Sequence, residues 1–373
     1  MPDPTEPTEP SEPDPSEPDP GEPTGPTDPT GPTDPTGPTE PEVPPGPLAC
    51  PAGVTCFEGF PFYDTGDTSL GASNLDRYAC APDKNEGGPE RVYRVLLPEP
   101  GLVVARLDGL PSGVDVDVHV LAGGESPAAA TCLDRGHWDS AALAPAGAVW
   151  IVVDSWVNAN GKALAGDYTL GVSFVAAGDF EAVGLDEAVL SAGLYAFSEA
   201  WKARDTTRFE YTVIDFSLHS IHPRLWTLDL ASGELLFAQR VSHGEGSADA
   251  QDTGWAVAFS NVEGSHKSSL GLMRTGARYM SGSNGLSLRL SGLERGLNDQ
   301  VYARAIVIHS DSYAADSYAE RNGRMGLSWG CQVIDPTRIA EFVDTVEGGS
   351  LVWTYFPDPT LEASRYLVGW TAP

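Results

Sequence analysis

Short apolar runs separated by Gly, Pro, Asp and Asn fill residues 49–177. The runs lie at 91–97, 101–110, 114–123, 148–156 and 166–175. From residue 114 to 120, valine alternates strictly with the polar residues Asp115, Asp117 and His119. This two-residue period is typical of a half-buried strand. We therefore predict an antiparallel β-sandwich and place these three polar residues on a solvated outer face rather than at a metal site.

The pattern changes at residue 178. Between 186 and 204, apolar residues recur at helical spacing, with acidic residues at the front and basic residues at the back, as in an amphipathic helix. Strand-like runs follow at 209–217, 224–242, 255–261, 286–293, 303–310 and 350–356. A Ser-Gly pair at 232–233 is suited to a hairpin turn. We predict a mainly β domain with a few helices over residues 178–373.

Residues 1–48 have a different composition from the rest of the chain. They hold 18 of the 32 prolines and 12 acidic residues, but no Lys or Arg. A segment with so little apolar surface cannot offset the entropy lost on folding. We predict a disordered stalk with polyproline II character that acts as a spacer, or alternatively as a solubilising tail.

Charge and cysteine usage limit the classes of function. A net charge of −31 argues against a nucleic-acid partner, because phosphate binding needs clustered Lys and Arg. Four of the five cysteines lie before residue 133, which predicts two disulfides and an oxidising compartment. Three connectivities are open, and we favour Cys50–Cys56 with Cys80–Cys132. We expect an exported monomer in the periplasm, tethered to the outer membrane or at the cell surface, whose signal segment is missing.

The fifth cysteine stands apart. Cysteine reacts as a thiolate and needs a base at neutral pH, and His309 stands at the end of the 303–310 run. Eighteen residues separate His309 from Ser328 in the sequence Ser328-Trp329-Gly330-Cys331. Gly330 allows the backbone to approach a substrate closely. We predict that Cys331 is a nucleophile; a buried structural thiol is the alternative.

These residues, with the stretch 259–299, resemble the murein L,D-transpeptidase catalytic domain family over residues 208–356. The resemblance implies attack of Cys331 on tetrapeptide stems of peptidoglycan, with His309 as base and no cofactor or metal. A thioacyl-enzyme would then give a 3,3 cross-link or, with water, L,D-carboxypeptidase activity. It also implies that backbone N–H groups of Gly330 and Cys331 bind the oxyanion, and that Ser328 or a backbone carbonyl orients His309.

The sequence departs from the family near the nucleophile, where Trp329 replaces the usual histidine and no Arg or Asn closely follows Cys331. We therefore expect Arg324 to bind substrate carboxylate, and we place four further residues in the substrate cleft. These are Trp329, His266, Ser268 and Ser269. A zinc site built from His219, His222, His243 and His266 is disfavoured, because Pro223 and the strand pattern do not suit a helical ligand pair.

Residues 49–177 resemble the bacterial pre-peptidase C-terminal domain, a secreted β-sandwich that accompanies hydrolases. That resemblance implies an accessory role. The function that competes with catalysis is a non-catalytic cell-wall or surface-binding protein on the same scaffold.

Overall fold

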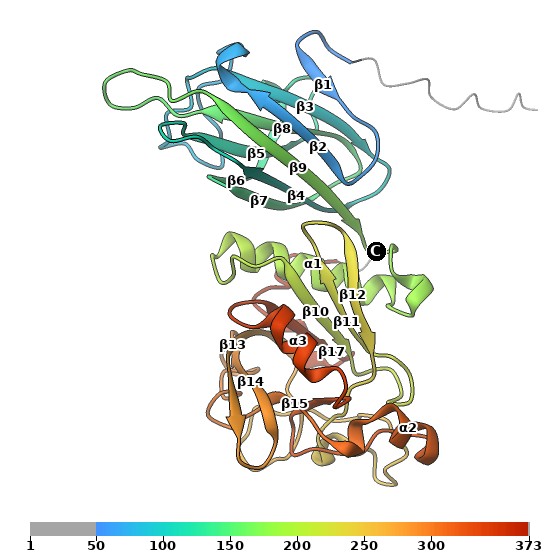
Figure 1. The fold of residues 1–373 in the computed structure, drawn as a ribbon. Coiled ribbons are helices and arrows are strands. Elements are labelled where there is room, and N and C mark those ends of the chain that lie inside the picture. The colour runs from blue at the N-terminus through green and yellow to red at the C-terminus, as the bar shows by residue number, and fades with distance from the viewer. Residues whose placement is uncertain (1–49, 372–373) are drawn as a thin grey trace, which may run out of the picture. The chain divides into compact units, whose positions relative to one another are not determined.

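The structure, a computed structural model, describes residues 50–371 (Figure 1). The predicted stalk at 1–48 lies outside the described residues. The described residues belong to one compact unit, and their strands form three sheets. The mainly β fold predicted from the sequence is confirmed.

Two sheets form a sandwich between residues 54 and 176. The five-stranded sheet runs in the order β1 (Val54–Cys56), β3 (Glu90–Leu97), β8 (Gly147–Ser155), β5 (Val116–Ala122) and β6 (Thr131–Gly136). The four-stranded sheet runs in the order β2 (Phe62–Asp67), β9 (Asp167–Ala176), β4 (Gly101–Asp108) and β7 (Asp139–Ala144). All neighbours are antiparallel except β1 and β3. Val116, Val118 and Val120 pack into the core between the sheets, as their alternation predicts.

The prediction that the residues opposite these valines lie on a solvated outer face is wrong for Asp117 and His119, because both are buried. The segment 72–88 covers this side of the sheet, and the Tyr78 ring stacks on His119 with 3.6 Å between ring centroids. Disulfides link Cys50 with Cys56 and Cys80 with Cys132, the pairing that the sequence favours. Periodicity marks which residues share a face, but it does not show that a distant loop will cover that face.

The third sheet has eight strands and forms the framework of the C-terminal part. Its order is β12 (Glu234–Gln239), β11 (Leu225–Asp229), β10 (Glu210–Asp215), β17 (Leu351–Tyr355), β13 (Gly271–Ser281), β14 (Gly285–Gly292), β15 (Val307–Ser310) and β16 (Gln332–Ile334). The pairs β10–β17 and β15–β16 are parallel, and the other neighbours are antiparallel. The β11–β12 hairpin turns at 230–233, where the Ser-Gly pair predicts it.

The predicted amphipathic helix is α1 (Glu187–Lys202), which Asp186 caps by accepting hydrogen bonds from the Ala188 and Val189 N–H groups. It contacts β10 and β17 on one side and β4 and β7 of the sandwich on the other. One apolar core therefore extends from Leu102 and Val104 of β4 into the eight-stranded sheet. Three shorter helices follow: α2 (Asp316–Asn322), α3 (Ile339–Val346) and α4 (Pro359–Glu362).

Two predicted strands differ in the structure. Residues 255–261 form no strand; their recorded backbone hydrogen bonds go singly to loops, as from Val257 N–H to Ser247 O, so no ladder forms. The 303–310 run becomes a strand only at Val307, because residues 301–305 are in turns and Ala305 has a φ of +54°. The apolar composition of 255–261 predicts a strand, but a strand also needs a neighbour with which to form a ladder.

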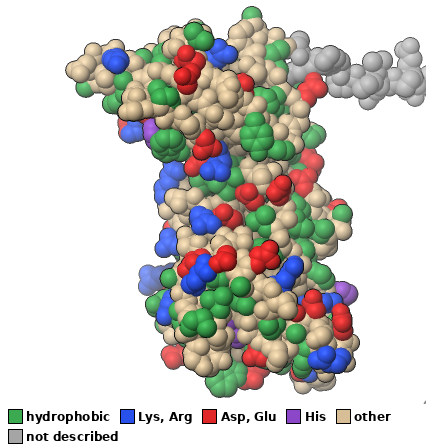
Figure 2. All heavy atoms as spheres, viewed as in Figure 1, with side chains coloured by type: hydrophobic (Ala, Val, Ile, Leu, Met, Phe, Trp, Pro, Cys, Tyr) green, Lys and Arg blue, Asp and Glu red, His purple; other side chains and the backbone are tan. Residues whose placement is uncertain are grey.

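Charged side chains of both signs lie on the surface. On the face drawn in Figure 2, several Lys and Arg side chains lie along the left edge, and most Asp and Glu side chains lie in the middle and on the right. None of the helices described between residues 50 and 371 has the length and apolarity that crossing a membrane requires.

Candidate active site

Two adjacent parallel strands bring His309 and Cys331 to one cavity. His309 lies in β15 opposite Val333 of β16, and Cys331 immediately precedes β16. Both residues line a cavity of about 460 Å³, together with Arg304, Tyr313 and Trp329 among others. The long loop between them holds α2, which returns the chain to the edge of the sheet.

The backbone just before Cys331 is held in a tight turn by Ser328. The Ser328 hydroxyl accepts a hydrogen bond from the Gly330 N–H at 3.1 Å and donates one to the Cys331 carbonyl at 2.7 Å. Gly330 has a φ of +110°, and a Cβ there would lie 2.7 Å from the Lys267 carbonyl oxygen. Both the dihedral angle and the close approach require glycine at this position.

The Cys331 thiol is largely sheltered from water. The residue is 9% exposed and packs with Val307, Met325 and Val333. Burial raises the pKa of the Cys331 thiol, while Arg304 acts in the opposite direction. The resting side chain is therefore a neutral thiol at neutral pH, and reaction requires a base to remove its proton.

The His309 ring is suited to act as that base. Its Nδ1 lies 3.2 Å from the Ser310 carbonyl oxygen. Because a carbonyl only accepts, Nδ1 carries the proton, and Nε2 is left with a free lone pair. Burial lowers the pKa of His309, which favours this neutral form near pH 7.

Arg304 is a cavity residue that sequence reasoning missed. Its guanidinium donates to the carbonyl oxygens of Ser260 and Lys267, each at 2.6 Å, and to the hydroxyls of Ser265 and Ser269. It thereby ties the segment 260–269 against the loop that carries Gly330. The available signal was an arginine inside the otherwise apolar 303–308 run.

The predicted serines lie in this tied segment. Ser268 and Ser269 are fully buried and are not among the residues that line the cavity. The Ser268 hydroxyl donates to the Gly330 carbonyl at 3.2 Å and accepts from the Gly244 N–H at 3.0 Å. The Ser269 hydroxyl donates to the Ser260 carbonyl. Ser268 therefore supports the turn 328–331, which we call the nucleophile loop after the predicted role of Cys331.

Trp329 lines the cavity, whereas His266 is not among the lining residues and contacts the cavity only through Trp329. The two rings stack at 4.8 Å with an interplanar angle of 2°, and Trp329 is 71% exposed. His266 Nδ1 also lies 2.6 Å from a Glu245 carboxylate oxygen. His266 therefore supports one face of the exposed Trp329 ring.

The remaining predicted residues lie elsewhere. Arg324 pairs with the Asp252 carboxylate at 2.5 Å and is not among the cavity residues. His243 is buried, with Nδ1 2.8 Å from the Arg224 guanidinium, whereas His219 contacts the Thr253 carbonyl. In the part of the chain that the structure describes, His219, His222, His243 and His266 form no group of metal ligands.

Comparison with known families identifies the C-terminal part. Residues 181–355 match the family model described as the L,D-transpeptidase catalytic domain. This match confirms the family expected from the residues around Cys331. The resemblance of residues 49–177 to the pre-peptidase C-terminal domain stays a prediction.

Solved structures similar to this chain include an L,D-transpeptidase from Mycobacterium smegmatis (14% identity, TM-score 0.26) and L,D-transpeptidase 1 from Mycobacterium tuberculosis (14%, TM-score 0.23). Each match includes 40% of this chain. It includes 59% of the M. smegmatis chain and 62% of the M. tuberculosis chain. The periplasmic g-type lysozyme inhibitor PliG from Aeromonas hydrophila, at 14% identity and TM-score 0.22, covers 32% of this chain and is itself covered to 96%. No curated protein matches the chain. These structural similarities are too distant to indicate an activity. The assignment of residues 181–355 to the family comes from the sequence match alone.

Proposed function

We propose that this chain, whose residues 181–355 match the L,D-transpeptidase catalytic domain family, is a cysteine-dependent acyltransferase that acts on tetrapeptide stems of peptidoglycan. The observation that supports this most directly is the shared cavity of Cys331 and His309, with the His309 ring oriented by the Ser310 carbonyl. A nucleophile beside a base that is itself oriented by a third group is the arrangement that covalent acyl transfer uses.

The first step forms a thioester. His309 Nε2 accepts the thiol proton, and the Cys331 sulfur forms a bond with the carbonyl carbon of the third stem residue. The bond from that carbon to the nitrogen of the terminal D-alanine breaks, and the nitrogen receives the proton held by His309. In the second step an amine of a neighbouring stem attacks the thioester carbon, the carbon–sulfur bond breaks, and the amine proton passes through His309 to the Cys331 sulfur, which gives a 3,3 cross-link and the free thiol. Water in place of the amine gives an L,D-carboxypeptidase.

The backbone of the nucleophile loop contributes to oxyanion binding in this proposal. The Gly330 N–H already donates to the Ser328 hydroxyl. Its use as an oxyanion donor therefore requires exchange of that hydrogen bond, and the Cys331 N–H is the more direct candidate. The stacked rings of Trp329 and His266 are the proposed contact for the stem beyond the reacting carbonyl. Arg324 would reach a substrate carboxylate only by releasing Asp252.

The proposed reaction agrees with an exported protein. The two disulfides suit an oxidising compartment, and peptidoglycan lies outside the cytoplasmic membrane. The periplasm or the cell surface, with the predicted stalk as a spacer and tethering as an option, is the proposed location. A monomer stays our expectation.

A mass-spectrometric assay with tetrapeptide muropeptides tests the proposal. The intact chain should release D-alanine and carry a transient stem adduct on Cys331, and Cys331→Ala should lose both. His309→Ala should slow acylation by a factor on the order of 10² to 10⁴, the usual contribution of a positioned base. His222→Ala, at an exposed histidine outside the cavity, is the matched control and should leave the rate unchanged.

The alternative is a non-catalytic cell-wall or surface-binding protein, and the burial of Cys331 is the observation that favours it. A chain that binds muropeptides but never forms an adduct or releases D-alanine would support this alternative over acyl transfer.

A further inference from the structure

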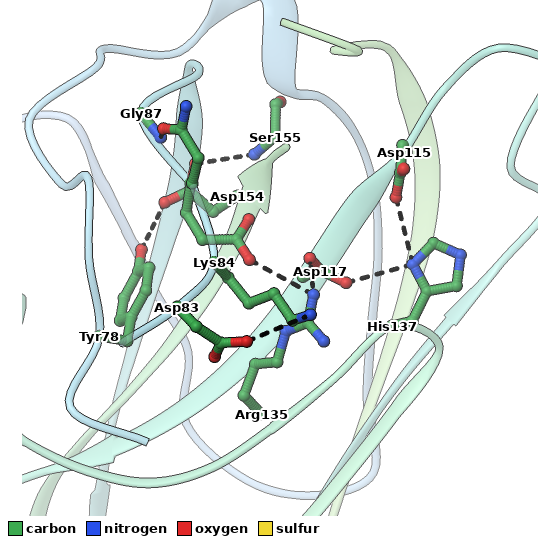
Figure 3. Close-up of polar contacts among 12 residues, drawn as sticks. Tyr78, Asp83, Lys84, Gly87, Asp115, Asp117, Arg135, His137, Asp154 and Ser155 are labelled. Atoms are coloured by element: carbon green, nitrogen blue, oxygen red, sulfur yellow. Dashed lines mark hydrogen bonds and ion pairs between the residues drawn. The ribbon is translucent and has the colours of Figure 1, made fainter. Parts of the chain in front are cut away.

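A cluster of ionisable side chains in the sandwich has no part in the proposed reaction. Asp115 and Asp117 come from the start of β5, and His137 directly follows β6. Figure 3 shows both carboxylates directed at the same ring nitrogen of His137. The distances from His137 Nδ1 to the nearest oxygens of Asp115 and Asp117 are 3.3 and 3.1 Å.

When the His137 imidazole is neutral, its Nδ1 proton can serve only one of the two carboxylates that face it. A neutral imidazole can donate only one proton from Nδ1, yet two carboxylate oxygens face that atom. Ligands bound at about 2.0 to 2.2 Å from one cation lie roughly 3 to 3.5 Å from each other. The three donor atoms all lie within 4.8 Å of one another, and the two measured pairs fall in the narrower range.

Three buried carboxyl groups and one guanidinium lie at this cluster or beside it. Asp117 pairs in register with Asp154 of β8, and both carboxyl groups are buried. Buried carboxyl groups are normally hydrogen-bonded, paired with a cation or bound to a metal. Glu86 adds a third buried carboxyl group, whereas Arg135 contributes the single guanidinium that contacts Glu86 and Asp117. Tyr78 donates a hydrogen bond to Asp154 but carries no charge.

Glu86 is a further buried carboxyl group beside this cluster. Its side chain is completely buried, and Oε2 accepts no hydrogen bond from the described residues. Its other oxygen, Oε1, lies 3.3 Å from Arg135 Nη2, and its carboxyl group contacts that of Asp117. Glu86 therefore places a buried oxygen next to Asp117.

We propose that Asp115, Asp117 and His137, with Glu86 behind them, form a binding site for one divalent transition-metal cation such as Zn²⁺ or Mn²⁺. Arg135 binds Oδ2 of Asp117, which leaves Oδ1, the atom nearest His137, for the metal. The imidazole ligand favours these ions over Ca²⁺, which prefers oxygen ligands. The cation would tie the segment that carries Glu86 to β5 and β6.

Titration of the metal-stripped full-length chain with Co²⁺ tests this site, because Co²⁺ is a visible-absorbing substitute for Zn²⁺. The Cys331→Ser background removes the thiol as a competing ligand. We expect one equivalent of Co²⁺ to bind with a nitrogen-ligated visible spectrum, Zn²⁺ to displace it, and the thermal unfolding midpoint to rise. His137→Ala and Asp115→Asn should each weaken Co²⁺ binding. Because each removes a direct ligand, the loss should exceed the factor of about 10 to 100 that is typical when a residue behind a ligand is removed.

Both substituted residues are partly exposed, so these variants should fold, and circular dichroism verifies that. His222→Ala is the matched control and should bind Co²⁺ normally. The acidic residues 1–48 offer oxygen ligands alone, so any binding there would survive His137→Ala. The proposal is overturned if Co²⁺ does not bind, if binding is unchanged in His137→Ala, or if Ca²⁺ alone stabilises the protein.

Discussion

At the scale of single residues, Cys331 and His309, the proposed nucleophile and base, are both held in their uncharged forms. Burial raises the pKa of the Cys331 thiol and lowers that of the His309 imidazole. Both shifts favour a neutral thiol beside a neutral imidazole over a thiolate–imidazolium pair. Proton transfer would then accompany attack rather than precede it.

The pH dependence of acylation follows from these directions. Protonated His309 cannot accept the thiol proton, so the rate should fall as pH drops through the pKa of His309, which lies below its usual value of about 6.5. Above that pKa the rate should stay level until the thiol itself ionises. Adduct formation with a tetrapeptide muropeptide, followed by intact mass between pH 4.5 and 9, measures this profile. An acid limb centred above pH 7 would contradict it.

Gly330 is a second single-residue determinant of the site. Gly330→Ala places a Cβ against the Lys267 backbone and forces an unfavourable φ, so we expect a loss of about 1 to 3 kcal/mol of unfolding free energy and no adduct on Cys331. Urea unfolding gives the stability change. Gly282→Ala is the control, since a Cβ there meets nothing within 4 Å, and should change stability by less than about 0.5 kcal/mol.

At the scale of elements, the site depends on a segment that is not a strand. Residues 260–269 lie behind the nucleophile loop and are held through hydrogen bonds to Arg304 rather than through a ladder. The same arginine lies close enough to Cys331 to lower the pKa of its thiol. Arg304 therefore links the position of the loop that carries Gly330 to the acidity of the Cys331 thiol.

Arg304→Gln separates these two effects. Loss of the guanidinium should raise the pKa of the Cys331 thiol and slow acylation by up to about 100-fold, the cost of a small misplacement of reacting groups. A thiolate absorbance titration measures the pKa, which a purely structural role would leave unchanged. Arg295→Gln, at an exposed arginine without a recorded ion pair, is the control. An unaltered thiol pKa in Arg304→Gln would contradict the electrostatic role.

At the scale of the whole molecule, the sequence predicts a division of the folded part into 49–177 and 178–373, whereas the contacts between these two parts favour one cooperative unit. The two parts share an apolar core through α1. They also share hydrogen bonds, from Trp201 Nε1 to Asp134 at 3.1 Å and from the Ser173 hydroxyl to the Leu230 carbonyl at 2.7 Å. This interface resembles the interior of one domain more than a linker-separated contact.

Limited proteolysis with a broad-specificity protease tests the whole-molecule organisation. We expect removal of residues 1–48 first, and then one resistant fragment that contains both disulfides and Cys331. Intact mass under non-reducing conditions identifies the fragment. Separation into two stable pieces near residue 178 would show that the shared core does not hold them together, and resistance of residues 1–48 would contradict the predicted stalk.

Local patterns in the sequence determined much of this protein. Alternation defined β5, helical spacing and Asp186 defined α1, and cysteine position separated the paired thiols from Cys331. The pattern from His309 to Cys331 was enough to indicate the family that residues 181–355 match. Each of these features is encoded within a short stretch or by residue type, so it can be read without knowing the fold.

Tertiary structure alone decided which residues distant in sequence meet. The cover over Asp117 and His119, the tie between Arg304 and residues 260–269, and the stack of Trp329 on His266 all join segments far apart along the chain. The same holds for the carboxylates around His137. Periodicity reports only the direction of a side chain relative to its neighbours in sequence. Burial, charge balance and pKa depend on what another segment places against it.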